Sequence, residues 1–262
     1  MTTATKPAVK LPKTTPSARV LYLYAISQMP ARRAPAIAVE GIDGAAPVEA
    51  IRCENYLCWI SRVSKADFAD HVTERMQDLE WLAAAGLRHQ RVVSEISSKL
   101  PTLPARFATV FLSEASLGKH IKDRGEALRV AFDRVAGADE WGVKLFALAA
   151  PKTRTTTPPA SGSEYLKRKA ELVQPREGKK LDSDVQQFVS ALSKLAMATG
   201  PGGKASAGQP GLVWHGSFLI RKGDRKKLET LLRSYARQWQ DVRRIDCSGP
   251  WPPYSFVGEH AV

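Results

Sequence analysis

The chain contains 262 residues, of which 44% are hydrophobic and 25% charged, a composition typical of globular proteins. Lys and Arg outnumber Asp and Glu by 39 to 26, which gives a formal net charge of +13. No apolar run reaches the roughly 20 residues of a membrane-spanning helix, the N-terminus lacks the apolar core of a secretory signal, and the three cysteines cannot all pair. These features predict a soluble cytoplasmic protein with two domains.

The excess positive charge lies in the N-terminal tail and in the second half of the chain. Residues 1–19 carry four basic and no acidic side chains, residues 20–139 carry 15 of each, and residues 140–262 carry 20 basic and 11 acidic ones. Such asymmetry bears on binding partners rather than on fold. It favours an acidic protein surface or nucleic acid as a partner, and a merely solvated basic face is the structural alternative.

The first part of the chain predicts a tail followed by an α+β domain. Residues 1–18 are rich in Thr, Pro and Lys, which predicts a flexible basic tail. The N-terminal α+β domain is expected over residues 19–139. β-branched and aromatic residues indicate its strands, at 19–27, 48–53, 56–63 and 105–112. Helical spacing of apolar residues, Leu87 among them, indicates its helices, at 64–79, 79–98 and 113–135.

A second domain is expected over residues 140–262, with mobile loops near 151–162 and 199–211. Apolar runs indicate its strands, at 140–150, 212–220 and 243–247. Amphipathic patterns indicate its helices, at 163–173, 183–196 and 224–239. Helices packed on one face of a small sheet in this order predict an α+β fold, with a ferredoxin-like arrangement.

Short polar side chains mark the helix starts. Ser183 with Gln186 has the spacing of a capping box, and Asp224 is placed to cap the helix that follows it. Asp78 and Glu80 are interpreted as helix-start residues that interact favourably with the helix dipole.

The sequence displays no recognisable catalytic, metal-binding or cofactor-binding motif. The five histidines are scattered, without the spacing of metal ligands. Cys53 and Cys58 lack a second cysteine pair, and strand packing accounts for them. No serine lies in a G-x-S-x-G elbow. The glycine-rich run at 200–204 lacks the first glycine and the hydroxyl residue of a phosphate-binding loop. The prediction is therefore a protein without enzymatic activity.

Nucleic-acid binding is the alternative function. A basic ferredoxin-like domain with aromatic residues on its strands describes an RNA-recognition sheet, and Trp214 and Phe218 share one strand face. However, the aromatic and glycine run of RNA-recognition sheets is missing, and core packing explains both rings equally well.

Several short segments between Tyr22 and Val257 are informative because of their order and spacing. They are Tyr22-Leu-Tyr-Ala25, Gly41-Ile-Asp-Gly-Ala45, Pro47-Val-Glu-Ala-Ile51, Asp78-Leu-Glu-Trp-Leu82, Leu103-Pro-Ala-Arg-Phe-Ala-Thr-Val-Phe111, Glu140-Trp-Gly-Val-Lys144, Ser161-Gly-Ser-Glu-Tyr-Leu166 and Gly249-Pro-Trp-Pro-Pro-Tyr-Ser-Phe-Val257. Together they resemble the gas vesicle protein family GvpL/GvpF. Ala105, Ala108 and the residues before Arg19 depart from the family pattern.

The resemblance implies a two-domain α+β protein whose second domain is a modified ferredoxin-like fold. It also implies an accessory factor or minor component of gas vesicles, located in the cytoplasm and at the vesicle. Its expected partners are the hydrophobic shell protein GvpA, whose aggregation it would limit during vesicle nucleation and assembly, and other gas vesicle accessory proteins. No small-molecule substrate, cofactor, metal or membrane is expected.

Physical chemistry suggests how such a protein would act on a shell subunit. An unassembled shell protein exposes apolar surface and strand edges, both of which promote association. Strand addition at a sheet edge or an apolar groove between helices would cover these features. The candidate contact is Trp251, Pro252, Pro253 and Tyr254, because Trp and Tyr dominate binding hot spots and prolines pre-order the backbone. The alternative is that these rings pack the last strand against the core.

Overall fold

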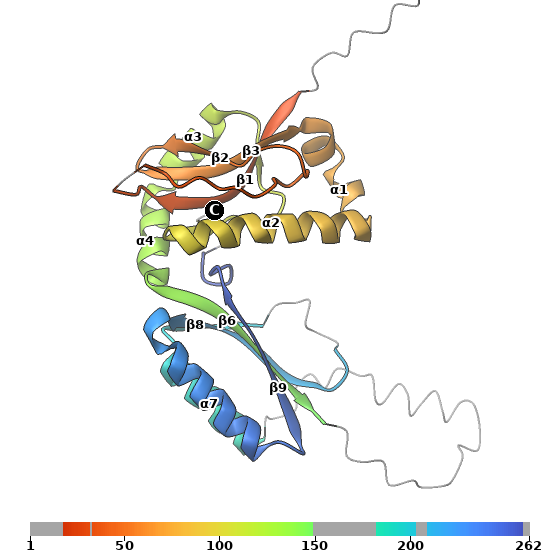
Figure 1. Cartoon of the computed structure of the whole chain (residues 1–262), viewed down its shortest axis with the longest axis vertical. Coiled ribbons are helices and arrows are strands. Elements are labelled where there is room, and N and C mark those ends of the chain that lie inside the picture. The colour runs from red at the N-terminus through yellow and green to blue at the C-terminus, as the bar shows by residue number, and fades with distance from the viewer. Residues whose placement is uncertain (1–17, 32, 149–181, 203–208, 259–262) are drawn as a thin grey trace, which may run out of the picture.

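The computed structural model describes residues 18–31, 33–148, 182–202 and 209–258. These residues form two antiparallel sheets with helices packed on them, so the fold class is α+β as predicted. The two sheet-and-helix layers lie one above the other in Figure 1, and the chain passes from the first to the second through one long strand. Residues 1–17 of the predicted tail, the predicted loop near 151–162 and the predicted helix at 163–173 lie outside the described residues.

The first sheet is built around a strand that is buried on both faces. Eight of the ten residues of this strand are buried, which explains its nearly continuous apolar sequence. The strands follow the order β2-β3-β1-β4, and β5 also pairs with β1. Their bounds are β1 (Arg19–Gln28), β2 (Glu49–Cys53), β3 (Tyr56–Ser64), β4 (Thr102–Pro104) and β5 (Val110–Phe111).

Helices cover both faces of the first sheet. One face packs against α2 (Leu79–Lys99), which contributes Val92, Val93 and Ile96 to a cluster with the strand tyrosines. The other face packs against α3 (Glu114–Asp123) and α4 (Gly125–Val135). Two short pieces, η1 (Ala66–Asp70) and α1 (Val72–Arg75), precede α2. They replace the single helix predicted over 64–79.

Two further predictions for this half are corrected by the structure. The stretch 105–112 is not one strand, because β4 and β5 are separated by a loop in which Ala108 has a φ of +65° and donates its N–H to the Tyr22 hydroxyl. The segment 113–135 is not one helix, because the backbone leaves helical geometry at Arg124, between α3 and α4. Leu87, predicted as an apolar position of α2, is 61% exposed.

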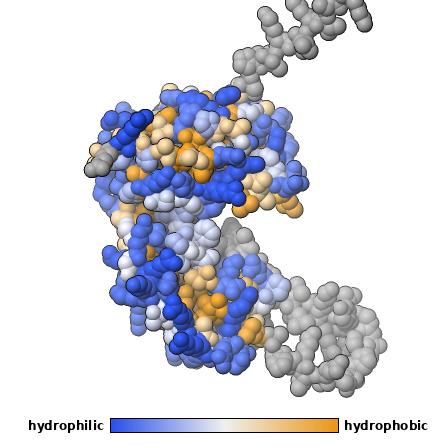
Figure 2. All heavy atoms as spheres, viewed as in Figure 1, coloured by the Kyte–Doolittle hydropathy of each residue, from blue (hydrophilic) through white to orange (hydrophobic). Residues whose placement is uncertain are grey.

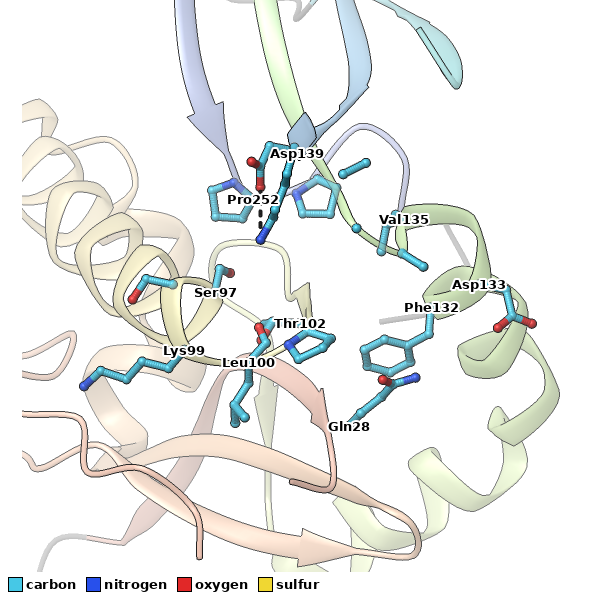
Figure 3. Close-up of a pocket in the computed structure, with 17 residues that line it drawn as sticks. Gln28, Ser97, Lys99, Leu100, Thr102, Phe132, Asp133, Val135, Asp139 and Pro252 are labelled. Atoms are coloured by element: carbon cyan, nitrogen blue, oxygen red, sulfur yellow. Dashed lines mark hydrogen bonds and ion pairs between the residues drawn. The ribbon is translucent and has the colours of Figure 1, made fainter. Parts of the chain in front are cut away.

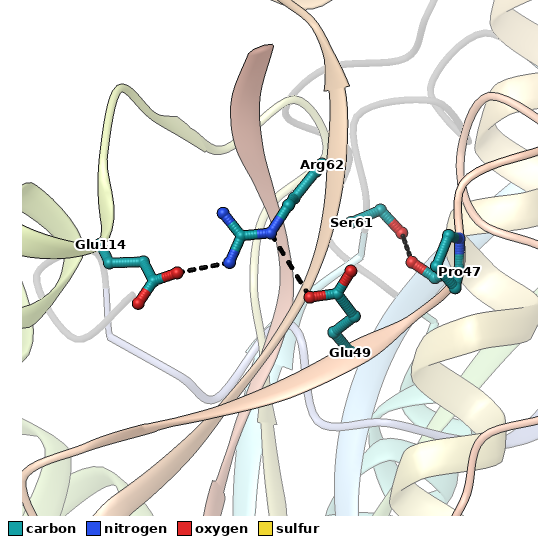
Figure 4. A network of polar contacts seen from close by, with 5 residues as sticks. All are labelled: Pro47, Glu49, Ser61, Arg62 and Glu114. Carbon is teal, nitrogen blue, oxygen red and sulfur yellow. Dashed lines mark hydrogen bonds and ion pairs between the residues drawn. The ribbon is translucent and has the colours of Figure 1, made fainter.

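A charged network joins the edge strand β2 to helix α3 (Figure 4). On β3, Arg62 lies with its Nε 3.4 Å from a carboxylate oxygen of Glu49, and its Nη2 pairs with Glu114. The contact with Glu114, above all, raises the pKa of the Arg62 guanidinium. The neighbouring Ser61 hydroxyl donates to the carbonyl of Pro47 at 2.7 Å. Charged side chains and a helix therefore flank this sheet edge.

The second sheet has the strand order β7-β8-β6-β9, with every neighbouring pair antiparallel. Helices cover one of its faces, where Trp141, Phe188, Phe218 and Trp239 share a cluster. Trp214 belongs to the edge of this cluster, so packing accounts for the Trp214–Phe218 pair. The elements are β6 (Ala138–Ala147), α6 (Ser183–Leu195), β7 (Ala198–Pro201), β8 (Leu212–Arg221), η3 (Lys222–Asp224), α7 (Arg225–Gln238) and β9 (Arg243–Trp251).

The structure also corrects details of this half. Gly200 and Pro201, predicted within a mobile loop, belong to strand β7. The predicted capping box of Ser183 is wrong, because Asp182 occupies the N-cap position of α6, without a side-chain capping bond. Asp224 does occupy the N-cap position of α7, but it pairs with Lys227 at 2.7 Å and caps no backbone N–H.

The two layers share a hydrophobic cluster. It contains residues of α3, α4 and the first sheet together with Ala138 of β6, Leu219 of β8 and Phe256, which follows β9. The segment after β9 therefore returns to the first layer and fills the space between the two sheets.

Candidate interaction surface

The predicted contact segment divides into one exposed residue and three that pack inside the molecule. Trp251 ends β9 with 40% of its surface exposed. Pro252 and Pro253 are buried, and Tyr254 packs against the cluster beneath α2. Of the four, Trp251 is therefore the most exposed, and its role as a contact stays a prediction.

A buried carboxylate fixes the course of this C-terminal segment. Glu140 of β6 accepts a hydrogen bond from the Ser255 backbone N–H at 2.8 Å and another from the Ser255 hydroxyl at 2.6 Å. Trp141 and Val143 of β6 pack in the cluster with α6 and α7. Because successive side chains of a strand point to opposite faces of the sheet, the Glu140 side chain lies on the face away from these helices. The clasp positions Trp251 relative to β6.

Beneath the segment lies a cluster of aromatic and polar rings. The Tyr254 ring lies 6.3 Å from that of His89, and the Tyr22 hydroxyl lies 2.9 Å from Nδ1 of His89. Burial lowers the pKa of His89 to about 4 and raises the pKa of Tyr254. His89 is therefore neutral at physiological pH and acts as a packed core residue.

A cavity of about 300 Å³ lies between the two layers (Figure 3). Its walls come from the end of α2, the end of α4, the start of β6 and the two buried prolines. On the second-layer side of the cavity, Asp139 and Lys222 lie with 3.8 Å between their charged atoms, and burial raises the pKa of Asp139. These opposite charges neutralise each other, and the cavity acts as an imperfectly filled joint between the layers.

Other exposed features lie on the two layers. On α2, Leu79 and Leu87 are exposed two turns apart, and Figure 2 shows apolar atoms at the border of the hollow between the layers. On α7, basic side chains are exposed, of which Arg225 and Arg233 pair with Glu229 within the helix. Both features are suited to non-covalent contacts.

The described residues hold no group of three or more His, Cys, Asp or Glu side chains able to bind a metal ion. No helix in the described part of the chain is long and apolar enough to cross a membrane. Sequence reasoning missed the Glu140–Ser255 clasp and the place of His89, because both pairings join residues more than 60 positions apart and no local spacing encodes them.

Comparison with known proteins identifies relatives of this chain. The family model described as gas vesicle synthesis protein GvpL/GvpF matches residues 20–258. A curated relative, gas vesicle protein L of Streptomyces sp. (strain CB03234), is 28% identical over 255 residues, which cover 92% of this chain and 93% of the relative.

Two crystal structures share the fold. Gas vesicle protein GvpF from Anabaena sp. PCC7120 superposes with a TM-score of 0.63 at 16% identity, covering 92% of this chain and 96% of that chain. GvpF from Microcystis aeruginosa superposes with a TM-score of 0.61 at 18% identity, covering 91% and 99%. Since the family model spans both sheets, every helix described and the C-terminal clasp, the chain belongs to the GvpL/GvpF family of gas vesicle proteins.

Proposed function

We propose that this protein is a non-enzymatic gas vesicle accessory protein that binds the shell protein GvpA and limits its aggregation during nucleation and assembly. The observation that carries the proposal is the family match over residues 20–258. In this proposal the protein acts in the cytoplasm and at the growing vesicle, alone or with other gas vesicle accessory proteins.

The arrangement of the chain supports a scaffold rather than a catalyst. Its polar networks, such as the Glu140–Ser255 clasp and the Arg62 pairs, join elements of the fold to each other. Its exposed apolar residues, including Leu87 and Trp251, lie at the surface, where a hydrophobic partner has access to them. Burial of such residues against a shell subunit would provide the favourable free energy of binding.

We further infer two domains, over residues 19–139 and 140–262, preceded by a basic tail over residues 1–18. The order β6-α6-β7-β8-α7-β9 with the sheet order β7-β8-β6-β9 supports a modified ferredoxin-like fold for the second domain. The shared cluster at Phe256 supports direct packing of the two proposed domains against each other.

Co-expression with GvpA tests the proposed function. The protein is purified by an affinity tag, and retained GvpA and total soluble GvpA are measured with and without it. Retention together with increased solubility of GvpA supports the proposal. Absence of both contradicts it, and the same preparation is then tested for nucleic-acid affinity, which would decrease steeply with rising salt if α7 bound phosphates.

The Trp251→Ala variant tests the predicted contact. Because Trp251 is 40% exposed, we expect its unfolding midpoint to stay nearly unchanged while GvpA retention decreases severalfold. A large decrease in the unfolding midpoint would instead assign the ring to core packing. Leu112→Ala, which also removes an exposed apolar side chain, serves as the control.

A further inference from the structure

Strand β9 is an edge strand with unpaired backbone groups on its outer side. Among the described residues its only strand partner is β6. On β6, the N–H of Ala147 points toward β8 and the N–H of Leu148 points toward Val242, so even-numbered residues of β6 face β9. These residues pair with even-numbered residues of β9, whose backbone groups therefore face β6. The N–H and C=O groups of Ile245 and Cys247 therefore face away from the sheet, where no described residue bonds them.

The charged side chains that usually protect an edge strand are paired within the molecule. Arg243 pairs with Asp182 at 2.7 Å and with Asp184, lies over the Trp239 ring, and has only 11% of its side chain exposed. Arg244 lies over the Phe146 ring and pairs with Asp246 at 3.1 Å. Natural edge strands commonly keep such charges free to repel an added strand.

The other sheet edges are better protected. β7 has four residues and ends at Pro201, β4 has three and ends at Pro104, and β2 is flanked by α3 and the Arg62 network. By contrast, β9 has nine residues, and its one proline, Pro250, lies next to its end, so residues 243–249 all carry a backbone N–H. Val242 (58% exposed) precedes the strand and Trp251 ends it. An added strand would meet an apolar side chain at each end and backbone partners in the middle.

We propose that the outer edge of β9, from Val242 to Trp251, binds an extended apolar strand of the unassembled shell protein by strand addition. This inference rests on the proposed function and names the surface that performs it. The backbone of the added strand pairs with Ile245 and Cys247, and its apolar side chains contact Val242 and Trp251. Shell strands bound in this way have no free edge on that side for association with one another.

Proline substitution at Cys247 tests the pairing. Cys247→Pro removes an N–H that no described residue accepts, whereas Cys247→Ala keeps it, so the two variants are matched. With co-expressed GvpA, we expect Cys247→Ala to retain the wild-type amount and Cys247→Pro to retain about tenfold less, equivalent to ~1.4 kcal/mol. Equal retention of GvpA by the two folded variants overturns the inference but leaves the proposed function intact. Failure of the wild-type protein to retain GvpA refutes the proposed function itself.

Amide hydrogen exchange of the unmodified protein provides a test that does not depend on the folding of a variant. In the free protein, Ile245 and Cys247 should exchange quickly, whereas Arg244 and Asp246 should be protected. In the GvpA complex, the first pair should become protected by at least about tenfold. Protection already present in the free protein would show that the chain itself or a second copy covers the edge, and unchanged exchange in the complex would show that GvpA binds elsewhere. Either result overturns the inference.

Discussion

His89 is a titratable side chain held neutral inside the first layer. Its ring contacts the Tyr22 hydroxyl, and burial lowers its pKa to about 4. In the unfolded chain an imidazole titrates near 6.5, so between these pH values the unfolded state binds a proton that the folded state does not. We therefore expect this residue to lower the free energy of unfolding as the pH decreases from about 6.5 to about 4, by up to ~3 kcal/mol.

The His89→Asn variant tests this expectation at the residue scale. Asn keeps a polar atom near the position of Nδ1 but does not titrate, so the variant should lose less stability than wild type between pH 7.5 and pH 5. Urea unfolding at both pH values measures the difference. His71→Asn, which replaces an exposed histidine, is the control for the substitution itself. Parallel slopes for wild type and His89→Asn would refute the buried neutral imidazole.

At the scale of single elements, two aspartates at helix starts provide a matched pair. Asp78 accepts hydrogen bonds from the N–H groups of Glu80 and Trp81 at the start of α2. Asp224 occupies the same position on α7 but bonds no N–H there. We expect Asp78→Ala to reduce the free energy of unfolding by ~1 kcal/mol and Asp224→Ala by only a few tenths. Chemical denaturation measures both, and equal losses would contradict the capping geometry.

The same comparison shows where sequence patterns are informative. Most strands and the long helix α2 were predictable, because apolar periodicity reflects which face is buried. The break at Arg124 and the loop around Ala108 were not, because tertiary hydrogen bonds such as that from Ala108 to Tyr22 override local propensity. Within the predicted contact segment, aromatic and proline content indicated importance but could not separate the exposed Trp251 from the buried Pro252 and the partly buried Tyr254, since burial depends on the distant first layer.

At the scale of the whole molecule, Phe256 joins the two layers. It is buried in the cluster that also contains Leu219 of the second sheet and Leu128 of α4. We expect Phe256→Ala to reduce the free energy of unfolding by ~3–5 kcal/mol, because it opens a cavity at the joint. Leu112→Ala, at an exposed position, should cost little. Thermal unfolding compares the two, and similar small losses would show that the layers do not depend on this ring.

The position of Phe256 has a consequence for protein synthesis. The ribosome releases a chain N-terminus first, and domains ordinarily fold in that order. Here the core of the first sheet includes Leu219 and Phe256, which are translated well over a hundred codons after strand β1. The hydrophobic core of the first layer is therefore incomplete in the nascent chain until Phe256 has been synthesised. Its final packing follows the synthesis of the whole second sheet.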